Sequence, residues 1–223
     1  LTTARLDQSV RRVLRDKFRL GLFDNPFVRM GDLWMVGHED IQKLGRISQQ
    51  RSLVLLKNEG KTLPLRNQPK VYLSNFDEAA VNKFATVVNS PEQADFIIQK
   101  LFTPFDERDE YLLEQFFHQG RLYFTPEELA PILALAATKP TITIMNLDRP
   151  AIITEIAAAS QAVIADFDSS DEVIAELIFG QFKPGGKLPF ELPSSQEAVE
   201  AQLEDVPYDS KNPLYVFGHG LSY

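Results

Sequence analysis

The chain has 223 residues, of which 44% are hydrophobic and 24% are charged, and this composition excludes a disordered or low-complexity protein. A formal net charge of −8 disfavours nucleic acid and membranes as partners. The absence of cysteine excludes disulfides, thiolate chemistry and cysteine-bound zinc. The length fits one α/β domain with an additional arm.

The apolar runs and the first residues of the chain indicate its expected cellular location. No run approaches the roughly 18 apolar residues of a membrane span, and the charged first residues do not resemble a signal peptide. The chain does not begin with Met, so we expect something upstream to have been removed. With no Asn-x-Ser/Thr acceptor present, we expect a cytoplasmic, bacterial protein.

The first 37 residues are expected to form a helix and an arm that lead from an upstream domain. The apolar spacing predicts a helix from residue 3 to residue 20, with Thr3 as its N-cap and Gly21 as the residue that ends it. We assign residues 38–223 to the main domain, which begins with a predicted helix over 38–52.

Strand and helix patterns alternate through the main domain. Extended segments are predicted at 53–57, 70–73, 95–101, 141–147, 162–167 and 187–192. Helices are predicted at 78–84, 111–117, 126–138, 150–159 and 170–179. Thr125 and Ser169 are the expected N-caps of the third and fifth of these helices. The pattern predicts an α/β three-layer sandwich of the flavodoxin-like type, with a mostly parallel sheet flanked by helices.

Ligand-facing loops in such a sheet lie beyond the carboxyl ends of its strands. Three loops qualify, at 102–110, 147–150 and 167–171, and all of them carry acidic residues. Asp148 and Asp171 stand at the starts of predicted helices, where an acid commonly serves as a cap, and we favour that role for both.

The loop over 102–110 has the most suggestive chemistry. Asp106-Glu107-Arg108-Asp109-Glu110 places four carboxylates around one arginine after a buried strand. Carboxylates this close to one another and to an arginine differ in proton affinity, which suits a general acid that works near neutral pH. The alternative is a solvated helix start with acidic residues in its first turn.

Other short motifs do not carry chemistry. The stretch from Gly180 to Leu188 is not a phosphate-binding loop, because Leu188 stands where a hydroxyl must hold magnesium and because a helix precedes it. His38-Glu39 does not start a zinc-protease helix, since Gln42 occupies the second histidine position. The three histidines are scattered, which disfavours a serine-hydrolase triad. We expect neither a cofactor nor a metal.

Several segments together resemble the carboxyl-terminal domain of glycoside hydrolase family three, the group of β-glucosidases, β-xylosidases and β-N-acetylhexosaminidases. The matching pieces are Ala4–Asp7 with Phe18–Phe23, Ser52–Gly60 with Leu63–Leu65, Gly186–Phe190 and Phe217–Tyr223. The order and spacing of these pieces also agree, so the resemblance covers nearly the whole chain.

The resemblance implies a retaining glycosidase that acts on β-linked oligosaccharides or on aryl and alkyl glycosides. Its aspartate nucleophile would lie on an upstream barrel domain, and residues 1–37 would lead from that barrel. In β-glucosidase-like members, a loop of the second domain supplies the acid/base carboxylate, and the loop over 102–110 occupies the corresponding place. The chain alone is therefore expected to be inactive, and to self-associate through the face that would dock on the barrel.

Site residues are carried over by the same resemblance. The acid position falls on Asp106, with Glu107 as the alternative, and Arg108 and Asp109 flank it. His118, in a Phe-His-Gln-Gly piece, would either contact sugar or cap a helix. Asp168 lies where many relatives carry Pro-Gly-Gln, which implies altered aglycone contacts.

Two other functions remain open from the sequence. The first is a non-catalytic structural or carbohydrate-binding module that stabilises the barrel. The second is a free-standing flavodoxin-like nucleotide binder, which is disfavoured because no Gly-rich phosphate loop follows a predicted strand.

Overall fold

The computed structural model describes residues 2–223. The chain divides into two compact units, of which the first ends at Gly45 and the second begins at Arg46. The first unit contains α1 (Thr3–Arg19), a 3-10 helix over Met30–Met35 and the start of α2 (Glu39–Ser52). The N-cap of α1 is Thr2 and not Thr3 as expected, because Thr2 has the extended backbone of a cap and its hydroxyl accepts from the Arg5 N–H. Gly21 follows the helix with a φ of 69°, as predicted for the residue that ends it.

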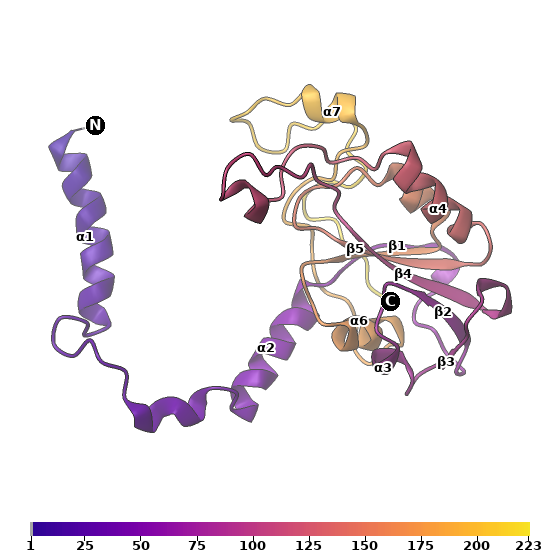
Figure 1. The fold of residues 1–223 in the computed structure, drawn as a ribbon, viewed down its shortest axis with the longest axis horizontal. Coiled ribbons are helices and arrows are strands. Elements are labelled where there is room, and N and C mark those ends of the chain that lie inside the picture. Colours follow the sequence, from indigo (N-terminus) through magenta and orange to yellow (C-terminus); the bar gives the residue numbers. More distant parts are fainter. Residues whose placement is uncertain (1) are drawn as a thin grey trace. The chain divides into compact units, whose positions relative to one another are not determined.

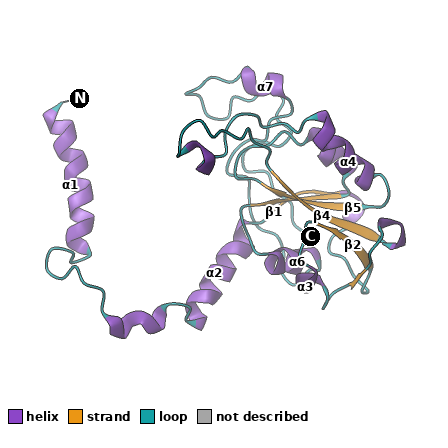
Figure 2. Ribbon diagram, viewed as in Figure 1, coloured by secondary structure: helices purple, strands orange, loops and turns teal. Residues whose placement is uncertain are grey.

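The second unit is built on one six-stranded sheet (Figure 2). The strands are β1 (Val54–Asn58), β2 (Lys70–Ser74), β3 (Thr86–Val87), β4 (Phe96–Phe102), β5 (Thr141–Asn146) and β6 (Ala162–Asp166). Their order is β1-β6-β5-β4-β2-β3. Only β1 runs antiparallel to its neighbour, so the predicted mostly parallel sheet is confirmed.

Helices cover both faces of this sheet (Figure 1). On one face, α3 (Glu78–Val81) and α6 (Asp171–Ile178) pack against a core that includes Ile142 and Ile144. On the other face, α4 (Pro126–Ala136) and α5 (Thr154–Ala159) pack against a core that includes Met145 and Val163. Consecutive residues of one strand thus enter different cores, as the two-residue period of a strand requires. The three-layer prediction is confirmed.

The predicted N-caps have different outcomes. Thr125 caps α4 in a capping box: the Thr125 N–H donates to the Glu128 carboxylate, and the Glu128 N–H donates to the Thr125 hydroxyl. Ser169 was the wrong residue, because its N–H is bound by Asp166 in the turn after β6, and Ser170 is the N-cap of α6.

Several predicted elements are shorter than expected. The helix predicted from Pro150 begins only at Thr154, because Ile152 forms a bridge with Tyr123 and its N–H donates to the Leu122 carbonyl. The helix predicted over 111–117 is a single 3-10 turn at Glu114–Phe116, where the apolar side chains are exposed and gain no packing. The segment 187–192 is not a strand and forms only an isolated bridge, from Leu192 to Tyr215. The helix α7 (Gln196–Glu200) was not predicted.

The C-terminal tail completes the β1 side of the sheet. The Leu221 N–H donates to the Leu55 carbonyl, and His219 Nε2 lies 2.8 Å from the Leu56 carbonyl oxygen. A Cβ on Gly186 would overlap the Leu53 carbonyl, and one on Gly220 would overlap the carbonyl of Gly186. The glycines of these two motifs therefore let the tail approach β1 closely.

Candidate functional site

A hollow of about 500 Å³ opens at the carboxyl ends of β4, β5 and β6, the edge at which the sequence predicts a ligand site. Its lining consists of Phe102, Thr103, Phe105, His118, Asn146, Leu147, Asp148, Phe167 and Asp168. Three aromatic rings and a few polar groups are a lining typical of a small-molecule site.

A buried polar network supports the floor of the hollow. Asp166, which is fully buried at the end of β6, accepts hydrogen bonds from the Ser169 N–H at 2.8 Å and from Asn146 Nδ2 at 3.2 Å. Lys100 Nζ lies 3.8 Å from the Asp166 carboxylate and 2.7 Å from that of Asp171. These contacts satisfy a charge that would be costly to bury alone. They also fix the turn that holds Asp168 exposed at the rim, with a φ of 69°.

His118 and Asp148 meet at the wall of the hollow. His118 Nδ1 lies 2.5 Å from Asp148 Oδ2, although 30 residues separate them in the sequence. The His118 ring also stacks on Phe105, with ring centres 4.0 Å apart and planes within 14°. The first helix after Asp148 is α5, which begins at Thr154, so the structure does not place Asp148 at a helix start as the sequence suggested.

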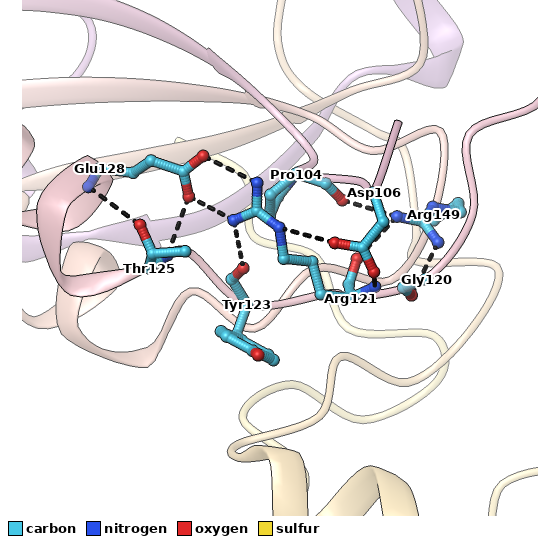
Figure 3. Close-up of polar contacts among 8 residues, drawn as sticks. All are labelled: Pro104, Asp106, Gly120, Arg121, Tyr123, Thr125, Glu128 and Arg149. Carbon is cyan, nitrogen blue, oxygen red and sulfur yellow. Dashed lines mark hydrogen bonds and ion pairs between the residues drawn. The ribbon is translucent and has the colours of Figure 1, made fainter. Parts of the chain in front are cut away.

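Arg149 holds together the loop that carries the acidic cluster (Figure 3). Its guanidinium donates to three backbone carbonyls, at 2.6 Å to Pro104, 2.8 Å to Arg121 and 3.2 Å to Gly120. The two ends of the segment 104–121 are thereby fastened to the residue that follows Asp148.

Asp106 braces the same segment. Its carboxylate accepts from the Arg121 backbone N–H at 3.0 Å and from Arg121 Nε at 3.2 Å (Figure 3). Its own N–H donates to the Gln119 carbonyl at 2.8 Å. Gly120 has a φ of 75°, and a Cβ at this position would overlap the Asp106 carboxylate. Both carboxylate oxygens of Asp106 therefore act within the loop.

Arg121 extends this bracing to the start of α4. Its two terminal nitrogens bind both carboxylate oxygens of Glu128, at 2.5 and 2.9 Å (Figure 3). The hydrogen bond from Arg121, followed by that from the Thr125 backbone, lowers the pKa of Glu128 to about 2. The hydrogen bond to Glu128 in turn raises the pKa of Arg121.

The structure divides the predicted site residues between neighbouring hollows. His118 and Asp168 line the hollow of about 500 Å³. Glu107, Arg108 and Asp109 are exposed and line a second hollow of about 450 Å³. Asp106 and Glu107 border a third, of about 400 Å³. Phe105 lines all three, so the acidic loop forms the wall between them.

Sequence reasoning missed three residues of this region. Asp148 was assigned to a cap, and Arg121 and Arg149 received no role. Asp148 could have been found from its place directly after the strand at residues 141–147, because ligands of a parallel sheet bind beyond the carboxyl ends of its strands. The two arginines had no such signal: Arg149 donates to backbone carbonyls, and the pairing of Arg121 with the carboxylates of Asp106 and Glu128 follows no local pattern.

Within residues 2–223, no group of three or more His, Asp or Glu side chains is arranged to hold a metal ion. In the same part of the chain, no helix combines the length and apolar character that crossing a bilayer requires.

Known proteins resemble the chain along nearly its whole length. It is 44% identical to a probable beta-glucosidase C of Aspergillus flavus over 98% of this chain and 35% of that protein. It is 40% identical to a periplasmic beta-glucosidase/beta-xylosidase of Dickeya chrysanthemi over 100% of this chain and 35% of that protein. The chain thus spans about a third of the length of these relatives.

A solved structure shares the fold. A beta-glucosidase from Listeria innocua, crystallised in complex with gluconolactone, superimposes with a TM-score of 0.71 at 21% identity and covers 100% of this chain and 39% of its own. The sequence profile of the glycosyl hydrolase family 3 C-terminal domain matches residues 73–223. The chain therefore belongs to glycosyl hydrolase family 3, of which it carries the C-terminal domain.

Proposed function

We propose that the protein is a retaining β-glucosidase-like glycoside hydrolase, and that this chain is the domain that completes its substrate cleft. The substrates are β-linked oligosaccharides or aryl and alkyl glycosides. The observation that carries the proposal is the match to the probable beta-glucosidase C of A. flavus over 98% of the chain. Because the chain spans only 35% of that relative, we assign the nucleophile to the part of the protein outside it.

The geometry of the strand ends supports this function. A sugar ring presents apolar faces and a polar rim, and the hollow offers Phe102, Phe105 and Phe167 together with polar side chains. The acidic loop stands beside it with exposed carboxylates from Asp106 to Glu110. This combination suits a cleft that binds a neutral polyol and transfers a proton.

The acid/base role belongs to this loop in our proposal. Retention requires two carboxyl groups about 5–5.5 Å apart, one that attacks and one that donates a proton. Asp106 is less available, because Arg121 engages both of its carboxylate oxygens. Glu107 is exposed, and no hydrogen bond or ion pair within residues 2–223 engages its carboxylate. Glu107 is therefore the first candidate for the proton donor.

Exchange of the two acids in the full-length protein tests the assignment. We expect Glu107→Gln to lose about 10²- to 10⁴-fold in kcat on aryl glucosides with poor leaving groups, to lose far less on activated ones, and to regain turnover with azide. Asp106→Asn is expected to lower the thermal midpoint, without rescue by azide. Unchanged kinetics in both variants would instead favour a structural or carbohydrate-binding module.

A further inference from the structure

The pair formed by His118 and Asp148 has a geometry that the acid/base loop does not explain. The two residues come from separate segments and line the same hollow, with His118 Nδ1 2.5 Å from Asp148 Oδ2. Their side chains are 49% and 38% exposed, so the pair is accessible from the hollow. A surface contact between long, mobile side chains would cost conformational entropy, but histidine and aspartate each have only two rotatable bonds.

The surroundings of the pair fix the histidine ring. Phe105 stacks on it at 4.0 Å, and Asp148 holds Nδ1. Asp148 is held in turn, because the next residue, Arg149, donates to the carbonyls of Pro104, Gly120 and Arg121. The ring is thus held through one nitrogen and one face. Within residues 2–223, Nε2 of His118 has no hydrogen-bond partner.

A carboxylate only accepts hydrogen bonds, so it selects the histidine tautomer with the proton on Nδ1. The neutral ring then presents a lone pair at Nε2. A lone pair that is held in place beside aromatic walls suits a hydroxyl donor, as on a pyranose ring.

We propose that His118 binds a sugar hydroxyl through Nε2, and that Asp148 is the positioning residue that sets its tautomer and orientation. The inference rests on the proposed function for the class of ligand, but not for the chemistry of the cleavage. Asp148 contacts His118 and acts through it.

Glucose binding to the full-length protein tests this unit by calorimetry. We expect His118→Ala to weaken the dissociation constant for glucose about 5- to 10-fold, as for the loss of one hydrogen bond. Asp148→Asn should weaken binding to a similar extent, because an asparagine amide can donate to Nδ1 and force the proton onto Nε2. His118→Gln, whose amide oxygen can accept near the position of Nε2, should retain part of the affinity. Asp205→Asn, at an exposed aspartate that does not line the hollow, is the control.

The double variant His118→Ala/Asp148→Asn separates positioning from independent effects. If Asp148 acts through His118, the double variant binds glucose within about twofold of His118→Ala alone, and the thermal midpoints of all variants stay near that of the wild type. Additive losses, or affinities within twofold of the wild type in either single variant, would overturn the proposal, and so would a wild type that does not bind glucose.

The proposed function fails on a different result. A wild type that hydrolyses no β-glycoside but binds glucose in a His118-dependent way would refute the hydrolase and leave the binding unit in place. A wild type that hydrolyses β-glycosides, with glucose binding that neither substitution weakens, would support the hydrolase and refute the binding unit.

Discussion

Arg121 joins two acids that belong to different parts of the fold, and this decides what those acids can do. The two terminal nitrogens of its guanidinium bind Glu128 at the start of α4. Its Nε and its backbone N–H bind Asp106 in the acidic loop. The two oxygens of the Asp106 carboxylate are occupied by these contacts, which leaves that side chain less free to reach a substrate oxygen. Glu107, one residue away and exposed, has no such restraint within residues 2–223. Two neighbouring acids thus differ in the freedom of their carboxylates, because Arg121 binds only one of them.

Substitution of Gly120 tests the close approach of Asp106. We expect Gly120→Ala to destabilise the protein by about 2 kcal/mol or more, because the new Cβ adds an overlap with the Asp106 carboxylate to the strain of a positive φ. Gly218→Ala is the matched control, since Gly218 has a φ of 77° and no described atom within 4 Å of its virtual Cβ. Urea unfolding should show a smaller loss for the control, and equal losses would refute the role of the overlap.

The low pKa of Glu128 predicts a dependence of stability on pH. Since the pKa of about 2 lies below the unfolded value, the ionised form stabilises the fold above about pH 4.5, and this contribution is lost as the pH falls toward 2. Glu128→Gln should therefore reduce the free energy of unfolding at pH 7 by at most about 1 kcal/mol, because the pair is partly solvated. The difference from the wild type should shrink as the pH approaches 2.

Glu127→Gln provides the control for that experiment. Glu127 occupies the same first turn of α4 and is exposed. Its substitution should leave the dependence of stability on pH unchanged, and a response equal to that of Glu128→Gln would contradict the assignment.

At the scale of elements, the C-terminal tail explains why the family motifs stand where they do. The pieces Gly186–Phe190 and Phe217–Tyr223 meet on β1, where the Leu188 N–H donates to the His219 carbonyl and the Leu221 N–H donates to the Leu55 carbonyl. The Tyr223 hydroxyl donates to the Leu177 and Phe182 carbonyls, and burial raises the pKa of Tyr223 to about 12. These motifs are therefore structural: none of their residues lines the hollow, although the Phe190 ring meets that of Phe167, in the lining, with ring centres 6.1 Å apart.

Adjacent glycines allow a direct test of this packing. Gly186→Ala should destabilise the domain by about 1–3 kcal/mol, because its Cβ would meet the Leu53 carbonyl and the Val54 side chain. Gly185→Ala should be neutral or slightly stabilising, since no described atom lies within 4 Å of its virtual Cβ. Thermal melts measure the difference. Equal shifts of the thermal midpoint in the two variants would disprove the role of the close contact at Gly186.

On the scale of the whole molecule, the chain spans about a third of the length of its relatives, and in the proposed function it supplies part of the cleft. The exposed apolar side chains that follow the acidic loop, within the segment 104–121, are consistent with a surface that the rest of the protein covers. These residues are Tyr111, Leu112, Leu113, Phe116 and Phe117. Self-association of the isolated chain and a cytoplasmic location stay predictions.

The isolated chain is expected to hydrolyse no aryl β-glucoside, because the nucleophile is assigned to the remainder of the protein. Release of p-nitrophenol by the pure chain and by the full-length protein, at equal molar concentration, measures this. Glu107→Gln in both preparations controls for contaminating glycosidases, whose activity it would leave unchanged. Turnover by the pure chain that this substitution abolishes would contradict the division of the active site.

The sequence alone determined the class of the fold, the strands β2, β4, β5 and β6, the capping box of α4 and the strand edge at which the hollow opens. Those features rest on local patterns, namely apolar runs, caps and turns. It also determined the family, through motifs of which those on β1 and in the C-terminal tail proved to be packing motifs. Only the tertiary structure decided the pairing of β1 with β6, the commitment of Asp106 to Arg121 and the meeting of His118 with Asp148. Each of these depends on contacts between segments distant in the chain, and no local period encodes which partner a side chain meets.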